Sequence, residues 1–72
     1  MKIELQLGMR IKYLRKRRGW SQEDLALNAD LNKNYLSDLE RGVRNPTLRV
    51  MEKIANALEI DLSELTKGLR SF

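Results

Sequence analysis

Apolar residues recur along the chain at spacings of three and four, which is the period of one face of an α-helix. Near the N-terminus Leu7, Ile11 and Leu14 follow this spacing, and Ile3 lies one turn earlier. Gly19 comes next, at the position where a helix commonly ends in a left-handed residue. The pattern predicts an amphipathic first helix that ends at this glycine.

Polar N-cap residues mark the start of two further helices. Ser21 is followed three residues later by Asp24, a form of the capping box, and predicts a short helix over about residues 22–29. Asn32 is a second N-cap, and the helix after it is predicted to stop at Gly42.

Thr47 caps a predicted fourth helix, and Asp61 with Glu64 caps a short fifth helix. The apolar positions of the fourth helix are Leu48, Met51, Ile54, Ala55 and Leu58. No segment alternates with the period of a β-strand. We therefore expect an all-α chain with short connections.

Composition limits both the size and the chemistry of the protein. Seventy-two residues suffice for one domain, which we assign to residues 1–72. The chain has no cysteine and no histidine, and so lacks the commonest metal ligands and the commonest general base. We expect no enzyme activity, no metal, no cofactor and no small-molecule ligand.

Charge and hydropathy indicate the kind of partner. The formal net charge is +4 and the pI is about 9.8, which favours an anionic partner. No window is apolar enough for a membrane span, and the N-terminus lacks the apolar stretch of a signal peptide. We expect a cytoplasmic protein that does not enter a membrane.

The second and third helices are separated by about three residues around Asp30. So short a connection suits two helices that cross steeply. This is the helix-turn-helix arrangement, over about residues 21–41, in which the second helix lies in the major groove of DNA.

Five short motifs in order carry a resemblance to a known family. They are "LR" ahead of a glycine, "SQEDLA", "YLSDLERG", "RNPT" and "MEKIANAL". With these motifs, residues 8–65 closely resemble the Cro/C1, or XRE-type, helix-turn-helix family. Two positions depart from its pattern: Asp30 stands where the family usually has glycine, and Leu27 where it usually has a charged residue.

This resemblance implies a five-helix, lambda-repressor-like domain that binds double-stranded DNA in a sequence-specific way and regulates transcription. The segment "YLSDLERGVRNPT" is most similar to controller proteins of restriction–modification systems. Phage-type repressors and antitoxin-like regulators are the close alternatives. A protein-interaction or RNA-binding module on the same fold is the alternative from another class.

The third helix can be divided into faces, because Leu36 and Leu39 define its buried direction. The candidate base contacts on the other faces and in the first turn are Lys33, Asn34, Ser37 and Asp38. Asp38 is open to three interpretations: an acceptor for a cytosine amino group, a partner for a neighbouring cation, or a solvated charge.

Candidate contacts to the DNA backbone flank this face. They are Gln22, Asn32, Tyr35, Arg41, Arg44 and Asn45. The family resemblance supports Gln22, and for Tyr35 packing against the core alone is equally compatible with its position.

Glu40 lies closer to the buried direction than to the outer face of the third helix. A half-buried carboxylate needs a cation. Arg15, on the flank of the first helix, is the candidate, and the resemblance supports an ion pair with a structural role.

The resemblance also implies a homodimer, because this family usually binds near-palindromic operators as two-fold dimers. We place the interface on residues 61–72. The candidate side chains are Leu62, Leu65, Leu69 and Phe72. In the competing interpretation, Leu62 and Leu65 close the core of the monomer.

Overall fold

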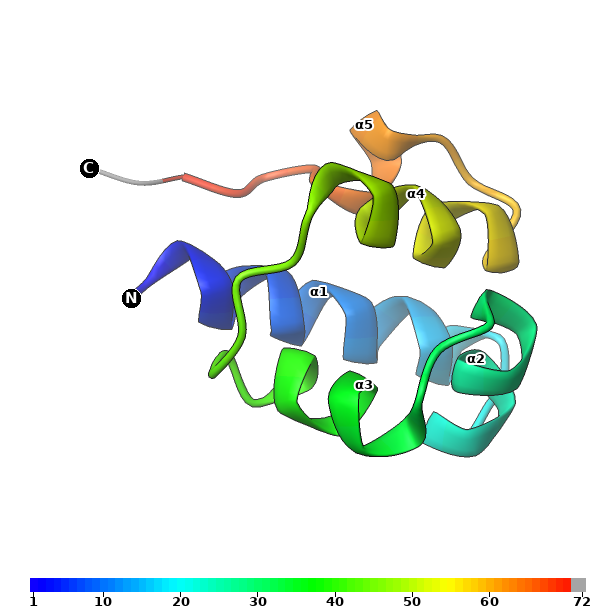
Figure 1. Cartoon of the computed structure of the whole chain (residues 1–72). Helices are drawn as coiled ribbons and strands as arrows, with labels where there is room; N and C mark the ends of the chain where they lie inside the picture. Colours follow the sequence, from blue (N-terminus) through cyan, green and yellow to red (C-terminus); the bar gives the residue numbers. More distant parts are fainter. Residues whose placement is uncertain (71–72) are drawn as a thin grey trace.

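Five helices make up the part of the chain that the structure, a computed structural model, describes, residues 1–70 (Figure 1). They are α1 (Ile3–Arg17), α2 (Gln22–Ala29), α3 (Lys33–Glu40), α4 (Leu48–Ala57) and α5 (Leu62–Leu65). The all-α prediction is confirmed, and each helix begins within a residue or two of its predicted start. Phe72 lies outside the described residues.

Side-chain caps begin four of the helices, as the sequence predicts. In the capping box of α2 the Asp24 amide donates to the Ser21 hydroxyl at 3.1 Å, and the Ser21 amide donates to the Asp24 carboxylate at 2.8 Å. Asn32, Thr47 and Asp61 accept from amides in the first turns of α3, α4 and α5. These bonds satisfy amide donors that a helix start otherwise leaves unpaired.

Left-handed residues follow the ends of the first four helices. Gly19 and Gly42 have φ of 73° and 76°, whereas Asp30 and Glu59 adopt 54° and 58° without being glycine. Asp30 thus takes a left-handed conformation at the position of the turn where the family usually has glycine. Asp30 allows the Leu31 amide to donate to the Ala26 carbonyl at 2.9 Å, which closes the end of α2.

The core is formed by twelve apolar side chains, eleven from within the five helices and Leu58 from the C-cap of α4. They are Leu7, Ile11, Leu14, Leu25, Ala26, Ala29, Leu36, Leu39, Ile54, Ala55, Leu58 and Leu65. Among the predicted apolar positions of α4, Leu48 is 68% exposed, because the first turn of α4 extends past the edge of the core. Leu27, at 82% exposed, is the exposed leucine on α2.

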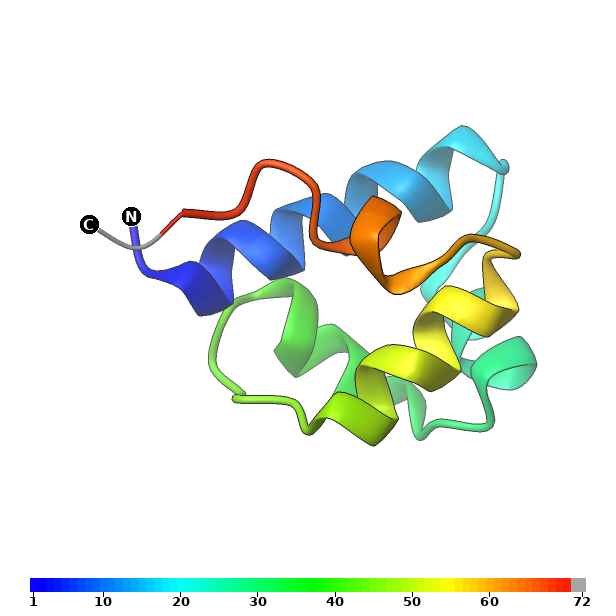
Figure 2. The same cartoon turned by 90° about the horizontal axis from the view of Figure 1, so that it is seen from above.

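Helix α1 packs against α3 and α5, and α2 packs against both α3 and α4 (Figures 1 and 2). The crossing of α1 with α3 is so close that the two backbones touch at Gly8. A Cβ at this position would lie 2.3 Å from the Leu39 carbonyl oxygen and 2.6 Å from the Glu40 carbonyl oxygen. Gly8 therefore fixes the distance between α1 and α3.

The segment after α5 runs back along α1, so that the two ends of the described chain lie near each other (Figures 1 and 2). The Gln6 amide group accepts from the Arg70 amide at 2.9 Å and donates to the Arg70 carbonyl at 2.6 Å. Arg10 donates to the Glu64 carbonyl at 2.8 Å and also pairs with its carboxylate. Leu69 packs against the core from the same segment.

Within residues 1–70, no helix combines the length and the apolar character that crossing a membrane requires.

The contact at Gly8 predicts an unusual sign for a glycine-to-alanine substitution inside a helix. Such a change ordinarily stabilises a helix by about 0.5–1 kcal/mol. Gly8→Ala should instead lower the free energy of unfolding by about 3 kcal/mol, because the added methyl group meets backbone atoms that cannot turn aside. Urea denaturation followed by circular dichroism measures this difference.

Gly19→Ala is the matched control, because no atom beyond its two chain neighbours lies within 4 Å of its Cβ position. It should cost only about 1 kcal/mol, for the left-handed backbone. A Gly8→Ala protein as stable as wild type would contradict the close crossing of α1 and α3.

Candidate nucleic-acid interface

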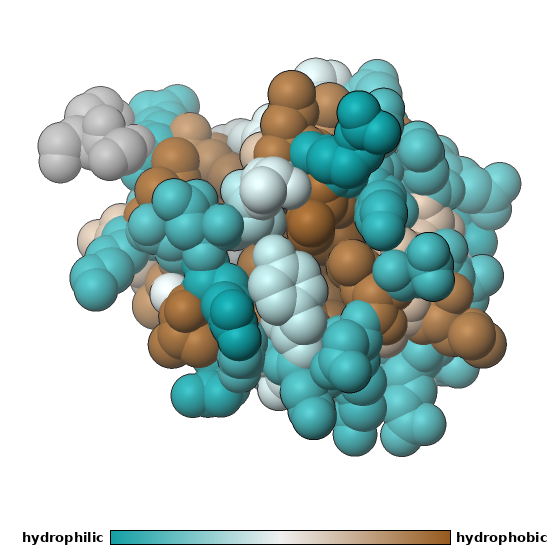
Figure 3. Space-filling model, viewed as in Figure 1, coloured by the Kyte–Doolittle hydropathy of each residue, from teal (hydrophilic) through white to brown (hydrophobic). Residues whose placement is uncertain are grey.

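The start of α2 and the outer side of α3 meet on one surface. Lys33, in the first turn of α3, has its ammonium group 3.7 Å from the Glu23 carboxylate of α2. In the view of Figure 1 this surface forms the lower edge of the molecule, and in Figure 3 it is covered mainly by hydrophilic side chains. Hydrophobic side chains show instead in the centre and upper part of that view.

The faces of α3 lie as the sequence predicts. Leu36 and Leu39 are 0% and 2% exposed and pack into the core. Lys33 and Asn34 are exposed, and Ser37 and Asp38 are half-buried on the outer side. The four candidate base contacts therefore all have atoms at the surface, with the first turn of α3 the most accessible.

Asp38 joins the two arginines that follow α3. One oxygen of its carboxylate lies 3.1 Å from Nη1 of Arg41, and the other lies 3.3 Å from Nε of Arg44. The Arg44 guanidinium also lies over the ring of Tyr35, 5.5 Å from its centroid. The end of α3 is therefore flanked by one connected group of side chains: Tyr35, Asp38, Arg41 and Arg44. Within it, Asp38 pairs with neighbouring cations.

Arg15 and Glu40 form a buried ion pair between α1 and α3. Arg15 donates from Nε to one Glu40 oxygen at 2.7 Å and from Nη2 to the other at 2.8 Å. The two side chains are only 8% and 4% exposed. The hydrogen bond with Glu40 raises the pKa of the Arg15 guanidinium above its ordinary value.

Arg15 and Glu40 also form hydrogen bonds with other groups. Nη1 of Arg15 donates to the Trp20 carbonyl at 2.9 Å, and Nε2 of Gln22 donates to Glu40 at 3.1 Å. Among residues 1–70 no buried side-chain nitrogen or oxygen lacks a hydrogen-bond partner. The pair thus connects α1, the start of α2 and the end of α3 through bonds that offset its desolvation.

Two of the predicted backbone contacts have side-chain partners within the protein, and the sequence analysis missed only that of Gln22. Gln22 donates to Glu40, and Asn32 accepts from the amides of Asn34 and Tyr35 at 2.7 and 3.2 Å. The position of Asn32 as an N-cap already signalled its bonds, whereas the position of Gln22 gave no sign of Glu40. Asn45 is exposed in the loop that leads to α4.

The predicted dimer contacts lie away from α3, and one of them is wrong. Leu65 is 0% exposed, because α5 turns it into the core of the monomer, where it cannot meet a second chain. Leu62 and Leu69 are half-buried and pack against the same core. Leu48, one of the predicted apolar positions of α4, lies at the surface and lines one depression together with Leu62.

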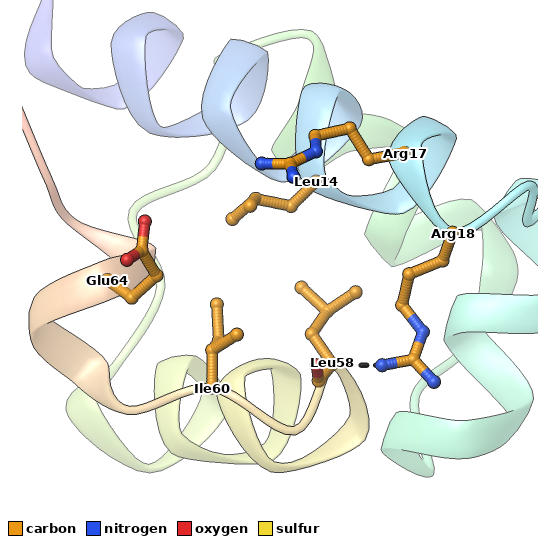
Figure 4. Close-up of a pocket in the computed structure, with 6 residues that line it drawn as sticks. All are labelled: Leu14, Arg17, Arg18, Leu58, Ile60 and Glu64. Atoms are coloured by element: carbon orange, nitrogen blue, oxygen red, sulfur yellow. Dashed lines mark hydrogen bonds between the residues drawn. The ribbon is translucent and has the colours of Figure 1, made fainter.

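A separate depression of about 350 Å³ lies between the end of α1 and the connection from α4 to α5 (Figure 4). Its lining residues are Leu14, Arg17, Arg18, Leu58, Ile60 and Glu64. Arg18 borders it and donates to the Leu58 carbonyl at 2.9 Å.

No group of three or more acidic side chains within residues 1–70 is placed to hold a metal ion.

Comparison with known proteins identifies the family of the chain. Residues 11–65 match the helix-turn-helix family HTH_3. The control protein C.MunI from a Mycoplasma species is 44% identical over 64 residues, which cover 88% of this chain and 86% of that protein. The chain spans about two-fifths of the length of two other curated relatives, at 40% and 41%.

Solved structures show the same likeness. The restriction–modification controller protein C.AhdI from Aeromonas hydrophila superposes with a TM-score of 0.84 at 40% identity, over 86% of this chain and 94% of that one. The biofilm regulator SinR, solved in complex with DNA, superposes with a TM-score of 0.78 at 38% identity, over 82% of this chain and 95% of that one.

Because of the buried ion pair, we expect substitutions on the inner and outer sides of α3 to change the free energy of unfolding by different amounts. Arg15→Ala and Glu40→Ala should each lower the free energy of unfolding by about 3–5 kcal/mol, because each leaves a buried charge without its partner. Asn34→Ala and Ser37→Ala, on the outer side, should change it by no more than about 0.5 kcal/mol. Urea denaturation of all four variants makes the comparison, and equal losses in both pairs would contradict the assignment of the faces.

Proposed function

Since the chain belongs to the helix-turn-helix family of DNA-binding transcription regulators, we propose that it binds one operator sequence in double-stranded DNA as a homodimer. The observation that carries the proposal is the exposed polar side of α3, held on a closely packed scaffold by the Arg15–Glu40 pair. A helix presented in this way fits the major groove and brings side chains to base edges.

Sequence selection is proposed to come from the first turn and outer side of α3. Lys33 suits the guanine O6 and N7 acceptors, and Asn34 suits adenine N6 and N7. Ser37, one turn further along the helix, can donate or accept at several base edges. Asp38 also faces this side.

Position on the DNA backbone is proposed to come from the groups around these side chains. Arg41 and Arg44 are 66% and 54% exposed and carry the positive charge beyond α3. Tyr35, Asn45 and the starts of α2 and α3 at Gln22 and Asn32 add neutral donors. Because Gln22 and Asn32 have intraprotein partners, their backbone amides are better placed than their side chains to meet phosphate.

The homodimer is proposed to form through the surface around Leu48 and Leu62. Leu48 is largely exposed, and both leucines line one depression with Arg49 and Glu52. These two charged residues form an ion pair at 3.7 Å beside the apolar centre. A patch that carries one cation and one anion is self-complementary under a two-fold axis, as a symmetric dimer requires.

The biological role is proposed to be that of a controller of a restriction–modification operon. Its support is the identity of 44% with the control protein C.MunI, together with the "YLSDLERGVRNPT" segment. Whether the protein activates or represses depends on where its operator lies relative to a promoter.

Selection from random duplexes, followed by binding of the enriched duplex over a salt series, tests the proposed function. The log of the binding constant should fall steeply with the log of the salt concentration, and one sequence class should be retained. Asn34→Ala should lose about 1–3 kcal/mol of discrimination at one base pair. Arg41→Ala should weaken binding to all duplexes and reduce the salt slope by about one.

Arg17→Ala is the control, because it removes the same charge from the exposed end of α1, outside both the candidate DNA surface and the proposed dimer surface. Binding that is flat with salt and unselective among duplexes, or preferential retention of RNA, would overturn the proposal.

The proposed dimer surface is tested by Leu48→Glu, with Leu27→Glu as the matched control. Both leucines are exposed and both changes add one negative charge, so neither should unfold the monomer. Leu48→Glu should raise the dimer dissociation constant at least about tenfold, since it buries a carboxylate in an apolar contact. Sedimentation equilibrium measures the constant, and equal effects of the two changes would place the interface elsewhere.

A further inference from the structure

The three cations of the candidate DNA surface all have acidic partners in the free protein. Lys33 pairs with Glu23 at 3.7 Å, and Arg41 and Arg44 both pair with Asp38. Two acids thus neutralise much of the charge that would otherwise attract phosphate. The pairing is densest at Asp38, where one carboxylate holds two guanidinium groups.

Asp38 lies deeper than the arginines that it holds. Its side chain is 28% exposed, against 66% for Arg41 and 54% for Arg44. The Tyr35 ring holds Arg44 from its other side. An approaching phosphate therefore meets two arginines whose charge is already shared with a carboxylate.

Sequence-independent binding to DNA depends on the attraction between cations and phosphates. A carboxylate within a few ångströms of both arginines opposes this attraction, since little salt lies between the groups at that distance. Base edges treat the carboxylate differently. The amino groups of cytosine and adenine can donate to it, whereas the O6 and N7 acceptors of guanine repel it.

Building on the proposed function, we propose that Asp38 determines specificity through repulsion. It weakens binding to DNA that offers only phosphates or acceptor atoms near the end of α3. It tolerates an operator that places a base amino group opposite its carboxylate. Selection of one partner by a cost imposed on the others is a general route to specificity.

Asp38→Asn tests this role, because the amide keeps the size of the side chain and loses its charge. Two duplexes serve as probes: the sequence enriched by wild-type protein, and a scrambled duplex of the same length and composition. Affinity for the scrambled duplex should rise about three- to tenfold at low salt. Affinity for the enriched duplex should rise less, so that the ratio of the two falls.

Glu59→Gln is the matched control. Glu59 is an exposed acid that pairs with Arg18 at 3.1 Å, and it lies outside both the candidate DNA surface and the proposed dimer surface. Its removal changes net charge equally and should shift affinity for both duplexes by less than about twofold. The rise caused by Asp38→Asn should also disappear near 1 M salt, where the screening length shortens to about 3 Å.

Three outcomes would overturn the inference. A loss confined to the enriched duplex makes Asp38 a base acceptor alone. Equal losses on both duplexes mean that it only orders the arginines, and no change on either makes it a solvated charge.

Thermal unfolding of Asp38→Asn at the wild-type temperature excludes misfolding as the cause. Failure of the proposed function itself is distinct, because wild-type protein would then not separate the two duplexes.

Discussion

The bidentate bond between Arg15 and Glu40 is the interaction on which the candidate DNA surface depends. It joins the last residue of α3 to α1, and through the Trp20 carbonyl and Gln22 it includes the connection to α2. Desolvation of two charges cancels much of the attraction between them, so the pair adds less net stability than its short distances suggest. Its main effect is geometric, because any other register of α3 against α1 leaves two charges buried without partners. The outer side of α3 therefore has one orientation relative to the rest of the fold.

Local signals explain why the helices could be predicted from the sequence. An N-cap and its first-turn amides lie within four residues of one another, so Ser21, Asn32, Thr47 and Asp61 could be identified without knowledge of the fold. The inward direction of Glu40 could be predicted because Leu36 and Leu39 define the face of the same helix. Its partner Arg15 could be predicted because a buried acid requires a cation and the family resemblance indicated which one.

Features that depend on how distant segments meet could not be predicted in the same way. Leu48 and Leu65 occupy equivalent-looking apolar positions near helix starts and ends, yet one is 68% exposed and the other 0%. Helical period gives the direction of a side chain but not whether another element covers it. The bond from Gln22 to Glu40 spans two helices, and the bond from Arg44 to Asp38 depends on the path of a loop. Neither leaves a trace in residue spacing.

The backbone contact at Gly8 has a consequence for how the protein could adapt to its partner. A helix pair separated by flexible side chains can slide, whereas α1 and α3 meet at the carbonyl groups of Leu39 and Glu40. For a protein that docks α3 against DNA, adjustment of shape must then come from the duplex. Bending a site of 20–30 base pairs costs about 1–6 kcal/mol, by an amount that depends on its sequence. Because the crossing of α1 and α3 is rigid, the deformability of base pairs that the protein does not contact becomes part of its sequence preference.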